Sequence, residues 1–120
     1  MKKYLKSLSE IKLLDIKIKN RILSSPRNIN SADLEGNVSD KTINYFENMA
    51  KNNLGIVTIG GTAVNPQGRN TINEMWVGKK SHLIGLTKLS TAIRKHGAKA
   101  ALQLSHVGPQ GNTVYNDQEV

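Results

Sequence analysis

Three short stretches of the sequence combine small residues with amide side chains, and none of them contains a carboxylate. They are Ser25-Pro26-Arg27-Asn28, Gly60-Gly61-Thr62 and Gln103-Leu104-Ser105-His106. Glycine lets a ligand approach the main chain closely, and an amide side chain offers both donors and an acceptor. Together the three stretches would suit a flat, neutral ligand that is held by hydrogen bonds.

Each stretch also has an ordinary structural explanation. Gly60-Gly61 could form a tight turn, Gln103 could be a buried amide bonded to backbone, and His106 could be a loop residue. The glycines do not make a dinucleotide fingerprint, because G-x-G-x-x-G is missing, and there is no P-loop. His82 and His96 have no carboxylates at ligand spacing, so no metal site is predicted.

The residues before the first stretch read as strand. Alternation between Ile11 and Leu23 predicts two short strands with a turn at Lys19-Asn20. Pro26 cannot donate to a sheet and ends this part, and the Asn-, Gly- and Ser-containing residues 27–38 are expected to form a loop.

A helix and a buried strand lead to the second stretch. Ser39 is a favourable N-cap for a helix that closes at Asn52-Asn53. The apolar run 54–59 is typical of a parallel strand covered on both faces. We expect a long loop from Gly60 to about Lys80.

The same order repeats before the third stretch. Leucine and isoleucine at helical spacing over 83–93 predict a second helix, and His96-Gly97 ends it. Residues 98–104 predict a further strand. Strands that alternate with helices are expected to be parallel, and ligands bind at the carboxyl ends of such strands. All three stretches are therefore expected at one edge of the sheet.

Composition limits the classes of function. The chain has 120 residues, 38% of them hydrophobic, which suits one domain over 1–120. It has no cysteine, so disulfides and thiolate metal sites are excluded. No run is long enough for a membrane span or a signal peptide, and the expected location is the cytoplasm.

The net charge of +8 comes largely from the first 21 residues. Such a balance could attract nucleic acid, so a non-catalytic basic binding module, for RNA among other partners, is the alternative function. The lysines alternate with apolar residues and lack stacking aromatics, which favours a solvated face. The tail after Gly108 is polar and is expected to be loop.

Four blocks in register resemble one known family. They are KNRIL (19–23), LEGNVSD (34–40), GIVTIGGTAVNPQGR (55–69) and HGAKAALQLSHVG (96–108). In these blocks the chain is similar to the N-terminal part of the old yellow enzymes, the FMN-dependent NADH:flavin oxidoreductases. The resemblance covers nearly the whole chain.

The resemblance implies the first three strands of a (β/α)₈ TIM barrel, capped by a hairpin over Ile11–Ile22. It implies FMN as cofactor, NADH or NADPH as reductant, and an activated alkene such as an α,β-unsaturated carbonyl as substrate. The residues it assigns to the flavin are Ser25, Pro26, Arg27, Asn28, Gly61 and Gln103. No catalytic residue is assigned.

This sequence also departs from the family pattern. Arg27 stands where an apolar residue is usual and would add a positive charge near the ring. Asn28 replaces a Thr or Cys, and Asn30 falls where some relatives place a substrate-contacting Tyr, so it is the candidate substrate residue. A complete barrel takes roughly 250 residues. An incomplete barrel exposes apolar surface, so we expect an inactive fragment that lacks a C-terminal barrel segment, or a homo-oligomer.

Overall fold

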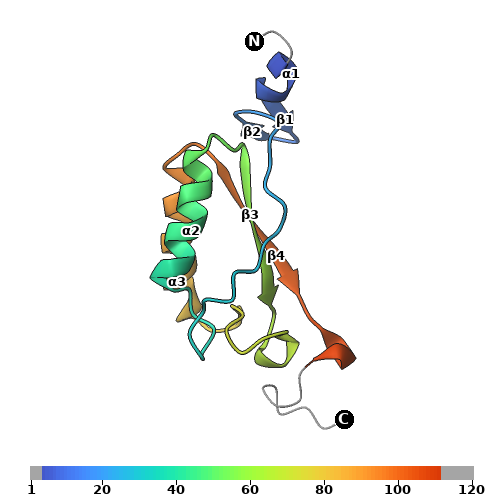
Figure 1. The fold of residues 1–120 in the computed structure, drawn as a ribbon, viewed down its shortest axis with the longest axis vertical. Coiled ribbons are helices and arrows are strands. Elements are labelled where there is room, and N and C mark those ends of the chain that lie inside the picture. The colour runs from blue at the N-terminus through green and yellow to red at the C-terminus, as the bar shows by residue number, and fades with distance from the viewer. Residues whose placement is uncertain (1–3, 112–120) are drawn as a thin grey trace.

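Two parallel strands, β3 (Ile56–Ala63) and β4 (Lys99–Ser105), form the centre of the computed structural model, which describes residues 4–111. Helices α2 (Asp40–Lys51) and α3 (His82–Arg94) lie together on one side of this pair (Figure 1). The alternation of helix and parallel strand that the sequence predicts is confirmed.

The segment over residues 23–27, which follows the hairpin, lies along the other edge of β3. It makes single parallel bridges, Leu23 to Ile56 and Arg27 to Ile59, instead of a continuous ladder. The Ser24 hydroxyl accepts a hydrogen bond from the Thr58 amide at 2.8 Å and replaces one ladder bond. The three segments that carry the candidate residues therefore run side by side, with β3 in the middle.

The core lies between the helices and the strands. Phe46 and Ala50 of α2 and Leu89 and Ile93 of α3 are buried against β3. Fully burying a side chain of this size contributes about 1.5–3 kcal/mol, so this contact supplies much of the drive for folding. Ser39 caps α2 as predicted, because its side chain accepts from the Thr42 amide.

The N-terminal hairpin differs from its prediction. Its strands are β1 (Ile11–Leu13) and β2 (Ile16–Ile18), and a short helix, α1 (Leu5–Leu8), precedes them. The turn lies at Leu14-Asp15, so the predicted turn at Lys19-Asn20 is wrong. Leu14 has φ +51°, which leucine rarely adopts, so its residue type gave no signal for a turn.

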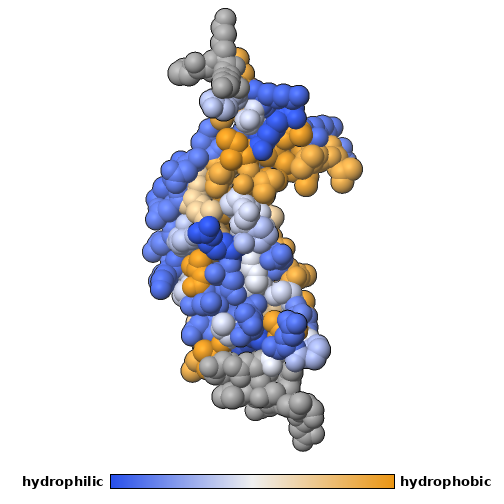
Figure 2. All heavy atoms as spheres, turned by 45° about the vertical axis from the view of Figure 1, so that its right-hand side comes forward, coloured by the Kyte–Doolittle hydropathy of each residue, from blue (hydrophilic) through white to orange (hydrophobic). Residues whose placement is uncertain are grey.

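Lys19 and Asn20 instead fasten the hairpin to the rest of the chain. The Lys19 ammonium donates to the His96 carbonyl at 2.8 Å. The Asn20 amide donates to the Asn53 carbonyl at 2.6 Å, and its oxygen accepts from the Ile22 amide. Figure 2 shows hydrophobic side chains gathered where the surface is hollowed beneath this hairpin. Residues that line a hollow there are Ile11, Leu13, Ile18, Ile22, Leu23 and Ile56.

Strand β3 continues beyond its predicted end. It passes through both glycines to Ala63, so the loop predicted from Gly60 begins four residues later. A Cβ at Gly60 would lie 2.4 Å from the Arg27 backbone nitrogen, too close for any side chain. Gly60 therefore lets two backbones approach, and this requirement is separate from any ligand.

The loop between β3 and α3 folds back against the sheet. It includes the turn η2 (Pro66–Gly68), and a similar turn, η3 (Gly108–Gln110), follows β4. Trp76 is buried beside Gly36, whose φ of +81° and missing Cβ make room for the indole. The His82 ring meets the same indole edge-on, with 4.5 Å between the ring centres.

An ion cluster joins the ends of the two helices. Lys95 lies 2.6 Å from a Glu47 carboxylate oxygen, and His96 lies 3.2 Å from the same atom. The hydrogen bond from Lys95, then that from His96, lowers the pKa of Glu47 to about 2. A carboxylate with a lowered pKa stabilises the fold above its unfolded pKa and loses this effect as the pH falls.

We expect Glu47 to make the chain acid-sensitive. Its pKa falls from 4.5 to about 2 on folding, so its contribution should be complete above pH 5 and should disappear between pH 5 and pH 2. Glu47→Gln should flatten this part of a plot of unfolding midpoint against pH. The exposed glutamate Glu35, changed to Gln, is the matched control, and equal curves for the two variants would contradict the prediction.

Gly60→Ala should destabilise the chain by about 2 kcal/mol, since its Cβ would overlap a neighbouring backbone that cannot move independently. The measurement is the free energy of unfolding in urea. Ser25→Ala, at an exposed site on the neighbouring segment, should change it by less than about 0.5 kcal/mol. A stable Gly60→Ala variant would mean that the two backbones are further apart than described.

Candidate functional site

Four predicted residues meet in one hollow at the carboxyl ends of the strands. The hollow has a volume of about 430 Å³, and Pro26, Asn28, Gly61 and Gln103 all line it. They come from three different segments that are far apart in the sequence. The strand ends thus bring these residues together, as the spacing of the apolar runs predicts.

A backbone irregularity turns Gly61 toward this hollow. Ile59 pairs with Leu102 and Thr62 pairs with Leu104, so β3 holds one extra residue between these pairs. Gly61 takes up the bulge with φ +56°, a conformation that glycine adopts without strain. Its amide then donates to the Gln103 side-chain oxygen at 3.4 Å. A hydrogen bond of this length is weak, so a ligand oxygen can compete for the amide.

The two amide side chains keep donors free for a ligand. The Asn28 side-chain oxygen accepts a hydrogen bond from the Asn30 backbone amide at 2.9 Å, and this bond orients the Asn28 side chain. Within residues 4–111, neither the Asn28 amide nitrogen nor that of Gln103 has a hydrogen-bond partner. With the Gly61 amide, the site offers three donor nitrogens and suits a ligand with several carbonyl oxygens.

Three of the predicted residues do not line this hollow. Ser25 is exposed beside it, and the Arg27 guanidinium points to α2, where it donates to the Tyr45 hydroxyl at 3.1 Å. Side chains alternate along an extended segment, so Arg27 faces away when its neighbours Pro26 and Asn28 face the hollow. In this structure the Arg27 guanidinium does not face the hollow, and its predicted contact with the flavin stays a prediction.

Asn30 also lies outside the hollow. Its side-chain oxygen accepts a hydrogen bond from the Thr71 hydroxyl at 2.7 Å, and its φ is +46°. It lines a much smaller space next to Phe46 and Met75. This contact gives Asn30 a structural role in holding the loop after β3, and a substrate role stays a prediction.

The hollow contains a carboxylate that the sequence analysis missed. Glu74 lines it, although the side chain is almost fully buried. One carboxylate oxygen accepts a hydrogen bond from the Asn70 backbone amide at 2.7 Å, and the other accepts one from the Ser105 hydroxyl at 3.2 Å. The three stretches themselves contain no carboxylate, and Glu74 brings one to the hollow from the loop after β3.

Glu74 reaches the hollow because its loop folds back along β3. The Met75 carbonyl accepts from the Ala63 amide at 2.9 Å, and the Val77 amide donates to the Ala63 carbonyl. A signal was present in the sequence, since Glu74 is the only acidic residue between Glu47 and Asp117. An isolated carboxylate in a basic chain is worth testing as a functional residue.

The histidines have structural partners. The Nδ1 atom of His106 accepts from the Gly108 amide at 3.0 Å, and the ring packs against Gly68. His82 contacts the Glu35 carbonyl, and His96 contacts Glu47. In the part of the chain that the structure describes, no three metal-ligating side chains gather, and none of the helices has the length and apolar character needed to cross a membrane.

A family model matches this chain over residues 9–120, and its description is NADH:flavin oxidoreductase / NADH oxidase family. The chain belongs to this family. The NADPH dehydrogenase of Halalkalibacterium halodurans is 37% identical to it over 94 residues, which is 78% of this chain and 28% of the relative. The NADH:acrylate oxidoreductase of Vibrio harveyi is 34% identical over 84% of this chain and 10% of its own length.

Solved structures agree with the family assignment. A 2-naphthoyl-CoA reductase complex superposes with a TM-score of 0.90 at 32% identity, over 96% of this chain and 18% of that protein. The old yellow enzyme of Trypanosoma cruzi gives 0.85 at 24% identity, over 98% and 31%, and supports the fold alone. The chain thus spans less than a third of these relatives. Members of the family use a flavin and a nicotinamide dinucleotide.

Glu74→Ala should destabilise the chain by about 2–3 kcal/mol, because it leaves the Asn70 amide and the Ser105 hydroxyl without an acceptor in a buried place. Ser105→Ala removes one partner only and should cost about 1 kcal/mol. Urea unfolding measures both. Glu35→Ala, at an exposed glutamate, serves as control, and an equal effect there would show that Glu74 has no such role.

Proposed function

We propose that this chain is the FMN-binding portion of an NAD(P)H-dependent flavin oxidoreductase of the ene-reductase type. The observation that carries the proposal is the meeting of Pro26, Gly61 and Gln103 in one hollow at the strand ends. Membership of the family supports flavin use, and the shape and donors of the hollow support FMN. Residues 1–120 would act as one partial domain of a (β/α)₈ barrel.

The donors of the hollow fit the pyrimidine end of a flavin ring, which carries two carbonyl oxygens. The Gln103 side chain, the Gly61 backbone amide and the Asn28 side chain would donate to these atoms. Pro26 would offer an apolar surface to the ring. Donors that point at a ring stabilise negative charge on it and so tune its reduction potential.

Glu74 would hold the hollow together and would not enter the reaction itself. Its carboxylate joins the loop after β3 to Ser105, two residues beyond Gln103 on the same face of β4. This link sets the position of Gln103 relative to Gly61. Both oxygens of Glu74 already accept hydrogen bonds, from the Asn70 backbone amide and the Ser105 hydroxyl, so Glu74 leaves the Asn28 and Gln103 side-chain nitrogens to the ring.

When bound, FMN supplies the chemistry of accepting a hydride and passing it on. The proposed reaction converts NAD(P)H, a proton and an activated alkene into NAD(P)⁺ and the saturated product. A relative is named for acrylate, an α,β-unsaturated carboxylate, and this supports an alkene conjugated to a carbonyl as substrate class. The choice between NADH and NADPH, a cytoplasmic location, and flavin contacts by Ser25 and Arg27 stay predictions.

FMN binding tests the proposal. The purified chain should quench FMN fluorescence weakly, because it spans less than a third of its relatives, and should not reduce alkenes alone. Gln103→Glu removes two donors and adds negative charge near the ring carbonyls, so it should weaken binding by about tenfold. Asn48→Asp makes the same change on the exposed surface of α2 and should leave the affinity unchanged.

Two results would contradict the proposal. Equal affinities of the Gln103 and Asn48 variants for FMN would show that the flavin does not bind in this hollow. A chain without affinity for FMN that binds RNA, with an affinity that falls steeply with salt, would favour the basic binding module. The structure offers the module little support, because Lys17 pairs with Glu10 at 2.9 Å and Lys19 bonds to the His96 carbonyl.

A further inference from the structure

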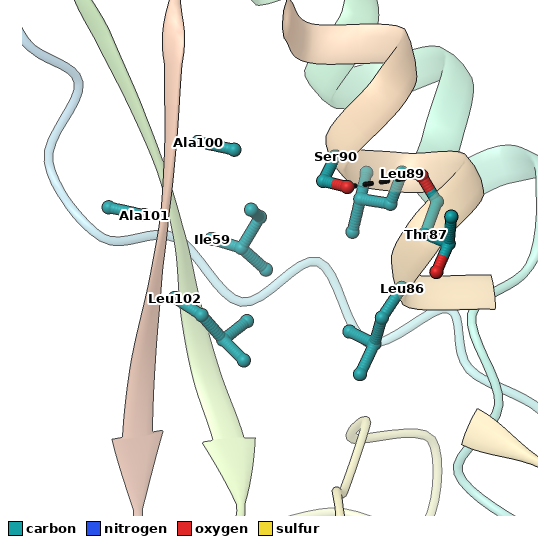
Figure 3. Close-up of a pocket in the computed structure, with 8 residues that line it drawn as sticks. All are labelled: Ile59, Leu86, Thr87, Leu89, Ser90, Ala100, Ala101 and Leu102. Atoms are coloured by element: carbon teal, nitrogen blue, oxygen red, sulfur yellow. Dashed lines mark hydrogen bonds between the residues drawn. The ribbon is translucent and has the colours of Figure 1, made fainter. Parts of the chain in front are cut away.

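The two faces of strand β4 have different neighbours. Figure 3 shows Ala100 and Leu102 projecting toward α3, whereas Ala101 points away from the helix. Side chains alternate along a strand, so Gln103 and Ser105 lie on the same face as Ala101. Both of them line the hollow at the strand ends. A side chain that contacts Ser105 from the hollow therefore lies on the same side of the sheet as the proposed flavin contacts.

Glu74 is such a side chain, and it is buried without a cation. Only 2% of its surface is exposed. Its oxygens accept from the Asn70 backbone amide and the Ser105 hydroxyl, and both of these donors are uncharged. Within residues 4–111, no lysine, arginine or histidine forms an ion pair with this carboxylate. Arg69, the cationic residue of the same loop, donates to three backbone carbonyls.

The link that Glu74 makes does not require a charge. A glutamine at this position would hold the same two groups, because its oxygen would accept from the Asn70 amide and its nitrogen would donate to the Ser105 oxygen. A carboxylate in the same place loses hydration on burial, and two uncharged donors compensate only part of this loss. The charge therefore needs an explanation besides the link, and the ligand hollow beside it supplies one.

We propose that the charge of Glu74 lowers the reduction potential of the flavin that binds in this hollow. This role rests on the proposed function of the site and adds control of its redox chemistry. Reduction by a hydride adds negative charge to the flavin ring. A fixed negative charge nearby therefore disfavours the reduced ring relative to the oxidised ring.

The strand places this charge close to the flavin contacts. Ser105 lies two residues beyond Gln103, and residues so spaced on one strand are about 7 Å apart. Charges act over this distance, and burial reduces the screening by water and salt. The donors of Gly61 and Gln103 act in the opposite sense, because they stabilise negative charge on the ring. The potential would then be set by the balance between these donors and Glu74.

The proposed reaction gives this balance a consequence. A lower potential makes the reduced flavin a stronger reductant toward the alkene, and it makes the oxidised flavin a weaker oxidant of NAD(P)H. The charge of Glu74 would thus favour the transfer of the hydride to substrate at the expense of its uptake from the nicotinamide. This effect is electrostatic, and the carboxylate exchanges no proton in it.

The ratio of two dissociation constants tests the proposal. The full chain is dialysed against oxidised FMN and, without oxygen, against dithionite-reduced FMN, in mildly alkaline buffer where the reduced ring is an anion. Glu74→Gln should strengthen binding of reduced FMN about tenfold relative to oxidised FMN, which raises the potential of this two-electron couple by about 30 mV. Ser105→Ala keeps the charge and removes one hydrogen bond, so this matched control should leave the ratio unchanged.

A second variant tests the same effect without a change in the buried side chain. Asn70 is exposed at the rim of the hollow, and its backbone amide, which every residue type except proline retains, is the group that bonds Glu74. Asn70→Lys places a positive charge beside the carboxylate and should shift the ratio in the same direction as Glu74→Gln. Circular dichroism checks that each variant is folded.

Three results would overturn the proposal. If the ratio is unchanged in Glu74→Gln or in Asn70→Lys while oxidised FMN still binds, the charge does not act on the ring, and the proposed function stands. If Glu74→Gln and Ser105→Ala change the ratio equally, the link and not the charge sets it. If the unchanged chain binds neither form of FMN, the proposed function fails and the role of Glu74 fails with it.

Discussion

The close approach of residues 26–28 to the bulge of β3 is the constraint on which the rest of the site depends. The Arg27 nitrogen occupies the place that a Cβ at Gly60 would take, so only glycine permits the contact. The extra residue in β3 then turns the Gly61 amide toward Gln103. Without this approach the strand ends would lie side by side, but their polar groups would not converge.

The sheet, the helices and the meeting of the strand ends could be predicted from the sequence because each depends on local patterns. Ser39 caps α2, Gly97 ends the turn after α3 with φ +77°, and uncharged residues mark β3. Pro26, Asn28, Gly61 and Gln103 follow such patterns directly, so their convergence could be expected once the strands were taken as parallel.

Other features could not be read from local patterns. Leu14 has a backbone conformation that is unusual for leucine, because the pairing of Leu13 with Ile16 leaves only Leu14 and Asp15 to form the turn. Arg27 was assigned to the site by its position, but the alternation of the segment and the Tyr45 hydroxyl turn it outward. Glu74 enters the hollow only because a loop of low sequence signal folds back to Ala63. In each case a contact that the local pattern does not show decides the outcome.

The chain contains a single tryptophan, Trp76, and its place has a practical consequence. The indole lies two residues beyond Glu74, in the loop that borders the hollow, and contacts both Gly36 and His82. Tryptophan fluorescence of this protein therefore arises from one known position. It reports on the position of this loop without an attached label.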